Sequence, residues 1–153
     1  MNLDEQIHDV ALFYFYSLLD RGKARYATIE TIRRIRQMKK KKNIPEGEMA
    51  SLVVSETLKG WEKTQSLHPS RLPAGVAAEH WEVPRRLDLG AWRQFHKSSD
   101  RDEFLALIWS QILGFTDDEI SQGLNVSTGT VRHRISRGLR GLSAALNPDR
   151  YDD

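Results

Sequence analysis

Apolar residues recur every three or four positions along most of the chain, and this spacing predicts α-helices. Apolar and polar residues do not alternate over any sustained stretch, and β-branched residues do not cluster between turn signals, as they would in strands. The spacing predicts helices over 4–20, 22–41 and 45–65, another near 88–96, and three more between 100 and 146. We therefore expect an all-α protein.

The first predicted helix is apolar on nearly every side, so we expect it to lie centrally. Its aromatic run, residues 13–16, is more typical of a core than of a ligand site. Its main apolar stripe is Ile7, Val10, Ala11, Tyr14 and Leu18. The second helix is expected to bury one apolar side and to expose its basic residues. That buried side is Ala27, Ile29, Ile32 and Ile35.

Proline content changes in the middle of the chain. Residues 66–90 hold three of the five prolines, which predicts a linker with a short helix near 74–81. Trp81 and Trp92 are too apolar for a free linker, so we expect them to pack against a lobe. The prediction is two small helical lobes, 1–65 and 91–146, followed by a tail over 147–153.

Composition excludes several classes of site. The chain has no cysteine, so disulfides, thiolate zinc sites and cysteine catalysis are excluded. The longest apolar run, 11–19, is about half of a membrane span, and the acidic first ten residues lack the basic start of a signal peptide. The five histidines show no metal-ligand spacing, and no catalytic motif is present. We expect a cytoplasmic protein associated with the nucleoid, not an enzyme, without cofactor, metal or membrane contact.

Charge is unevenly distributed although the net charge is only +2. Residues 21–42 hold ten basic residues and one acid, and residues 127–146 hold four arginines and no acid. Such clustering suggests a polyanion partner. In the first segment the candidates for non-specific contact are Arg33, Arg34, Arg36, Lys39, Lys40, Lys41 and Lys42. The alternative for the lysine run is a solvated helix face.

An ordered set of signals between residues 114 and 135 predicts a helix-turn-helix. Gly114 ends one helix, and Thr116 with Glu119 forms a capping box for the next. Asn125 suits the left-handed turn, and Ser127 caps the final helix. Thr130 stands where that second box would need Glu or Gln, so the box is incomplete. The predicted buried stripe is Val131, Ile135, Leu139 and Leu142.

The exposed side of the final helix carries groups that bind DNA. Ser127, Thr128 and Thr130 offer hydroxyls and free backbone N–H groups to phosphate. Arg132 is the best candidate for base contact, because its fork can bond guanine at two atoms. The other arginines lie further along the helix and are expected to hold phosphates; they are Arg134, Arg137 and Arg140. The alternative is an ordinary helical hairpin with a basic surface.

The stretch "GFTDDEISQGLNVSTGTVRHRISRGLRGL" resembles region 4 of bacterial sigma factors, particularly the extracytoplasmic-function type. The resemblance covers about residues 101–146. It implies binding to the −35 promoter element and to the flap of the RNA polymerase β subunit. The DNA-facing positions that it implies are Ser127, Thr128, Thr130, Arg132, His133, Arg134 and Arg137. The alternative for His133, which the residue type favours, is an ordinary surface histidine.

The sequence departs from the sigma pattern in several places. Asn125 replaces the usual turn glycine, Thr128 replaces a common acid, and the usual proline before the domain is absent. Both 11–38 and 52–61 are faintly similar to sigma region 2, and they cannot both occupy the same place in it. Residues 62–100 offer no segment similar to the one that melts promoter DNA.

Three functions therefore stay open. The first is a sigma-like transcription factor that binds double-stranded DNA and core RNA polymerase. The second is a sigma-like adaptor or decoy, bound to polymerase or to an anti-sigma protein, whose arginines pair with acidic protein surface. The third is a dimeric helix-turn-helix regulator unrelated to sigma factors. The first fits the sequence best.

Overall fold

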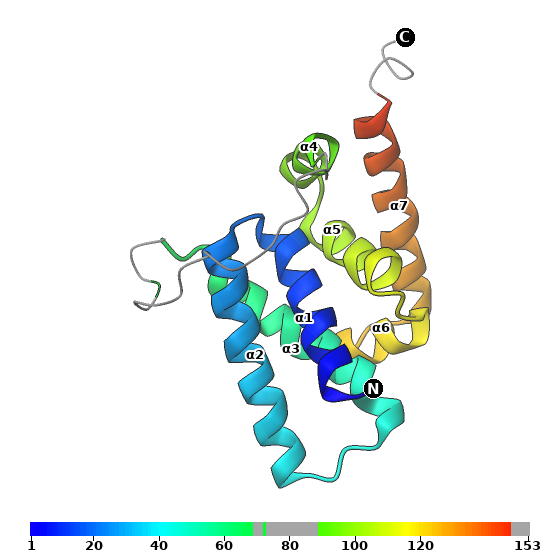
Figure 1. The fold of residues 1–153 in the computed structure, drawn as a ribbon. Coiled ribbons are helices and arrows are strands. Elements are labelled where there is room, and N and C mark those ends of the chain that lie inside the picture. The colour runs from blue at the N-terminus through cyan, green and yellow to red at the C-terminus, as the bar shows by residue number, and fades with distance from the viewer. Residues whose placement is uncertain (69–71, 73–88, 148–153) are drawn as a thin grey trace.

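The computed structural model describes residues 1–68, 72 and 89–147, and these residues contain helices and no strand (Figure 1). The expected all-α class is therefore confirmed for this part of the chain. In chain order the elements are α1 (Leu3–Leu18), α2 (Arg21–Lys41), the 3₁₀ turn η1 (Glu46–Glu48), α3 (Met49–Thr64), α4 (Gly90–Ser98), α5 (Arg101–Leu107), the π-helical turn η4 (Ile108–Ile112), α6 (Asp117–Leu124) and α7 (Thr128–Leu146).

Polar caps mark where the first two helices begin. Asn2 and Glu5 form a capping box at the start of α1, and Leu19 ends that helix in a left-handed conformation with φ of 53°. Asp20 then caps α2 by accepting a hydrogen bond from the Lys23 amide at 2.8 Å. These signals fix α1 and α2 as an antiparallel pair with a very short connection.

Two isoleucines that were expected to be buried lie at the surface. Ile7 is 37% exposed and Ile29 is 42% exposed, and both line a hollow of about 490 Å³ between α1 and α2. For α2 the prediction is confirmed for Ala27, Ile32 and Ile35 and was wrong for Ile29 alone. The buried side of α2 is Ala24, Ala27, Thr28, Thr31, Ile32 and Ile35. Ile29, two positions after Ala27, points away from it.

A polar network lies inside the N-terminal helices. The Tyr14 hydroxyl lies 2.6 Å from the Thr31 hydroxyl, and it also donates to the Thr57 carbonyl. Burial raises the pKa of Tyr14, so the phenol stays neutral and can act as a donor. The Glu56 carboxylate is almost fully buried and accepts from Arg34 Nε at 3.1 Å. The network satisfies buried polar groups that would otherwise destabilise the packing.

α4 links the N-terminal group of helices, α1–α3, to the C-terminal group, α5–α7. Trp92 is buried and donates its indole N–H to the Tyr16 carbonyl at 2.8 Å, which ties α4 to the end of α1. The expected packing of Trp92 is thus confirmed. Trp81, the helix expected near 74–81 and most of the segments expected as linker and tail lie outside the described residues.

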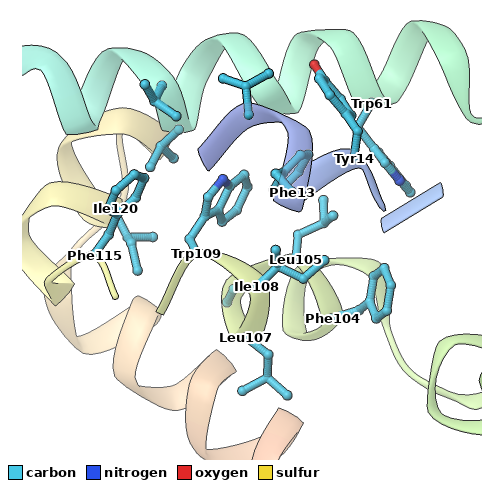
Figure 2. Packing of buried hydrophobic residues seen from close by; sticks show 14 of the residues in the cluster. Phe13, Tyr14, Trp61, Phe104, Leu105, Leu107, Ile108, Trp109, Phe115 and Ile120 are labelled. Carbon is cyan, nitrogen blue, oxygen red and sulfur yellow. The ribbon is translucent and has the colours of Figure 1, made fainter. Parts of the chain in front are cut away.

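Helices from both ends of the chain share one hydrophobic core. Figure 2 shows Trp109 between Phe13 on one side and Phe115 with Ile120 on the other, beneath α3. The rings of Phe13 and Trp109 stack at 5.3 Å, and the Trp109 indole donates to the Thr57 hydroxyl at 3.0 Å. The π-helical turn η4 carries Trp109, where the sequence had predicted an uninterrupted helix.

α6 rests closely against α3. A Cβ atom at Gly123 would lie 2.6 Å from the Val54 Cβ and 2.7 Å from the Ser51 carbonyl oxygen. Only glycine permits this approach, so the first helix of the helix-turn-helix is seated directly on the N-terminal group of helices. No helix in the described ranges is long and apolar enough to cross a membrane.

Candidate nucleic-acid interface

The start of α6 has the expected capping box. The Thr116 amide donates to the Glu119 carboxylate at 2.9 Å, and the Glu119 amide donates to the Thr116 hydroxyl at 3.1 Å. Two backbone donors at the helix start are thereby satisfied. Ile120 is fully buried one position later. The box and this anchor fix the position of the first turn of α6.

The turn between α6 and α7 also forms as the sequence predicts. Asn125 has φ of 57° and ψ of 46°, in the left-handed region. Val126 packs against the core, and the Ser127 hydroxyl accepts from the Thr130 amide at 3.1 Å. Thr130 does not return a bond to the Ser127 backbone. Instead its hydroxyl lies 2.9 Å from that of Ser127, so the second box is incomplete, as expected.

The buried side of α7 differs from the predicted stripe at one position. Val131 and Ile135 are buried, whereas Leu139 is 42% exposed and Gly138 is buried in its place. A Cβ at Gly138 would lie 2.9 Å from Leu107 and 3.0 Å from the Glu103 carbonyl. α7 therefore packs on α5 through a glycine, and the predicted burial of Leu139 was wrong.

Most of the predicted DNA-binding side chains are accessible. Ser127, Arg132, His133, Arg137 and Arg140 are exposed, and Thr128, Thr130 and Arg134 are half-buried. The helical period puts His133 and Arg140 on the side opposite the core, with Arg132 on the flank facing α6. Arg134 lies on the flank facing α5. The accessible face of α7 therefore includes the side opposite the core and both flanks.

Three of the four arginines form ion pairs within the fold. Arg132 Nε lies 3.0 Å from the Asp117 carboxylate, and Arg137 Nε lies 2.8 Å from Glu103. A guanidinium nitrogen of Arg134 lies 3.7 Å from Asp102. The acids come from the first turns of α5 and α6. They partly neutralise both flanks of α7.

These pairs are weak enough to be exchanged for phosphate. The side chains of Arg132 and Arg137 are 68% and 58% exposed, and exposed ion pairs contribute about 0–1 kcal/mol. A DNA phosphate can therefore replace the carboxylate on Arg137 at little cost. Among the described residues Arg140 has no ion-pair partner, so it is available without any exchange.

The basic segment 21–42 is a separate surface. In Figure 1, α2 lies at the left and α7 at the right, with α1, α3 and α5 between them. Arg34 is held by buried Glu56, and Arg33 pairs with Glu30 at 2.8 Å. The remaining candidates are exposed and form no ion pair within the described chain; they are Arg36, Lys39, Lys40, Lys41 and Lys42.

Sequence reasoning missed the acids beside α7. Asp117, Asp102 and Glu103 carry no role in the sequence-based prediction, although acids in the first turn of a helix suit its positive dipole end. No local pattern predicts these contacts, because 15 residues separate Asp117 from Arg132 and 34 separate Glu103 from Arg137. The described side chains contain no group of three histidines or acids placed to hold a metal ion.

Comparison with known proteins gives one match. Residues 100–142 match the family described as Sigma-70, region 4, and they run from the cap of α5 to near the end of α7. The expected resemblance is confirmed for this segment, which is under a third of the chain. No curated protein and no solved structure matches the chain significantly. The matched segment indicates sigma-factor-like DNA-binding transcription regulation.

Proposed function

We propose that this chain is a sigma-factor-like transcription factor that reads promoter DNA through α7 and contacts RNA polymerase in the cytoplasm. One observation carries the proposal. A capped α6, a left-handed turn and a capped α7 with an exposed cationic face lie inside the segment that matches sigma region 4. Helix-turn-helix proteins place such a second helix in the major groove.

In this proposal the residues of α7 have different tasks. Ser127, Thr128 and Thr130 surround the N-terminus of α7, where hydroxyls and free N–H groups can bind phosphate. Arg132 reads a base. Arg134, Arg137 and Arg140 hold phosphates along the groove, and His133 faces the DNA between them. Phosphate contacts fix the register, and base contacts select the sequence.

The experiment combines core RNA polymerase with random-sequence duplex DNA. The protein is tested with each alone and with both together at moderate salt, and the bound duplexes are sequenced. We expect the protein to retain polymerase, and we expect a sequence motif to be enriched only when polymerase is present. Enrichment of a motif without polymerase would instead indicate an independent regulator.

Two arginine variants test the assigned tasks. Arg132→Ala is expected to cost about 1–3 kcal/mol and to relax the preference at one base. Arg140→Ala, the matched control on the same helix, is expected to weaken all duplexes alike. Equal losses with unchanged preference in both variants would contradict the assignment of Arg132.

One observation favours a second function. The carboxylates of Asp102, Glu103 and Asp117 neutralise part of the α7 face, which lowers its attraction for DNA. A sigma-like adaptor that binds polymerase or an anti-sigma protein would tolerate this neutralisation. Retention of polymerase with no enriched motif under any condition would support the adaptor.

A further inference from the structure

We infer that Asp117 is a positioning residue that orients the guanidinium of Arg132 for recognition of a guanine. The inference rests on the proposed function and deepens it. Asp117 Oδ2 accepts a hydrogen bond from Arg132 Nε at 3.0 Å. The contact joins the first residue of α6 to the second helix of the motif. Within the described part of the chain, it is the one ion pair between α6 and an arginine of α7.

The atom that Asp117 binds determines what remains free on Arg132. A guanidinium has five N–H donors in one rigid plane. When Nε is occupied, the four hydrogens on the two terminal nitrogens remain, and they form a fork at the end of the side chain. Guanine presents two acceptors, N7 and O6, at the edge that such a fork can reach in the major groove. The pair therefore leaves free the donors that a guanine contact needs.

The backbone of Asp117 is held in place. It follows Thr116, whose capping box fixes the first turn of α6, and it precedes buried Ile120 by three positions. The Asp117 side chain is 37% exposed and that of Arg132 is 68% exposed, so the pair lies where a base edge can approach. A carboxylate on this fixed backbone restricts the rotamers of the long Arg132 side chain before DNA arrives, which lowers the cost of ordering that side chain on binding.

The other arginines of α7 lack this arrangement. Arg134 and Arg137 pair with Asp102 and Glu103 of α5, on the opposite flank of the helix. Arg140 has no acid partner among the described residues and stays free to follow phosphates. Only Arg132 combines high exposure, a place near the N-terminal end of α7 and a carboxylate of α6 on Nε.

Asp117 also carries a cost that distinguishes it from a residue that merely stabilises the fold. A carboxylate beside DNA repels phosphate, so it lowers affinity for every sequence. Selectivity often needs such a repulsive element, which penalises wrong partners more than the right one. Removing Asp117 should therefore raise affinity for unrelated DNA and lower discrimination at one base.

The test compares Asp117→Ala with Asp118→Ala, a matched control. Asp118 is exposed in the same first turn and carries the same charge, and its carboxylate forms no ion pair within the described chain. The motif selected by the wild type supplies the duplexes. Dissociation constants are measured for that motif and for versions with each guanine replaced by adenine, with core RNA polymerase present if selection required it.

Asp117→Ala is expected to reduce the guanine preference at least about threefold, at the same base pair whose preference Arg132→Ala removes. Asp118→Ala is expected to bind all duplexes more tightly with the preference unchanged. Asp117→Asn keeps an acceptor oxygen without the charge, so it should retain part of the preference. Circular dichroism melting of each variant confirms that it is folded.

Three results would overturn the inference while leaving the proposed function intact. They are an unchanged preference in Asp117→Ala, equal effects of the two alanine variants, and a selected motif whose preference does not depend on Arg132. If the wild type selects no motif with or without polymerase, the proposed DNA reading fails and the inference fails with it. That outcome is visible before any variant is made.

Discussion

Phe13→Leu should destabilise the helix-turn-helix, although Phe13 lies on the first helix of the chain. Phe13 is fully buried, its ring stacks on Trp109 at 5.3 Å with an interplanar angle of 14°, and it meets Tyr14 edge-on at 5.2 Å. Leucine keeps most of the apolar volume, which limits the packing loss to under about 1.5 kcal/mol. Removing each aromatic pair adds about 0.5–1.5 kcal/mol.

The two aromatic pairs and the packing term together give an expected loss of about 1–4.5 kcal/mol in the free energy of unfolding. For a chain of this length that corresponds to a fall in Tm of roughly 2–18 °C. Since the stability of a native protein is about 5–15 kcal/mol, the variant should remain folded. Urea titration at 25 °C measures the loss directly.

Native-state hydrogen exchange locates the effect. If both groups of helices unfold with their shared core, the most protected amides of α7 should lose the same free energy as those of α3. Phe15→Leu is the control, because Phe15 is half-buried on the same helix and its ring contacts Tyr16 rather than Trp109. Unchanged protection of α7 in Phe13→Leu, with reduced protection in α1–α3, would refute the shared core as a cooperative unit.

Three further outcomes follow from the fold and the charge distribution. Gly123→Ala should lower the free energy of unfolding by about 1–3 kcal/mol, because the added Cβ forces α6 away from α3. Gly129→Ala is the control: its Cβ would meet nothing closer than 3.8 Å, so this variant should gain up to about 1 kcal/mol in stability. Equal urea midpoints of the two variants would contradict this. Burial lowers the pKa of His96, so the unfolded chain binds that proton more readily and stability should fall as pH drops below about 6.5. Urea titrations at several pH values should show a shallower fall in His96→Gln, and an unchanged pH dependence in that variant would contradict this. Replacing Lys39–Lys42 with glutamine should make the dependence of log K for DNA binding on log salt concentration less steep, by about 0.9 for each phosphate that the lysines neutralise. The preferred sequence should not change. An unchanged slope would show that the lysines face solvent or a protein partner.

Local rules predicted the helix-turn-helix well. The capping box at Thr116, the left-handed Asn125 and the cap at Ser127 each depend on residues within three positions of one another. Such short-range hydrogen bonds form wherever the helix forms, so the sequence alone suffices to find them. The match to sigma region 4 confirms the same segment.

Errors arose where small or polar residues are buried. Leu139 was expected in the stripe of α7, but the close approach to α5 takes place at Gly138, which no hydrophobic pattern marks. Ile29 was expected inside with Ala27, Ile32 and Ile35, and those three are buried, but the other inward positions of α2 belong to Ala24, Thr28 and Thr31, and Thr31 is held by Tyr14. Periodicity of apolar residues cannot detect buried positions that are occupied by glycine or threonine.

Contacts between distant segments were also beyond prediction. The ion pair of Arg132 with Asp117 depends on how α7 crosses α6, which the spacing of residues along the chain does not specify. The same holds for Trp109, which the π-helical turn directs toward Phe13 and Thr57. These contacts arise from tertiary packing, and the proposed selectivity of the site depends on the first of them.

The close packing of α6 on α3 limits how this helix-turn-helix can be exchanged between proteins. A segment that starts at residue 100 and is joined to another chain would expose Trp109 and Phe115. It would also leave the side of α6 that carries Gly123 without its partner helix α3. A working chimera would have to carry α1 and α3 along, or supply a host surface with the same recess for Gly123. If the proposed function holds, base preference is therefore best altered by point substitutions on α7 and α6, not by transferring the helix-turn-helix to another protein.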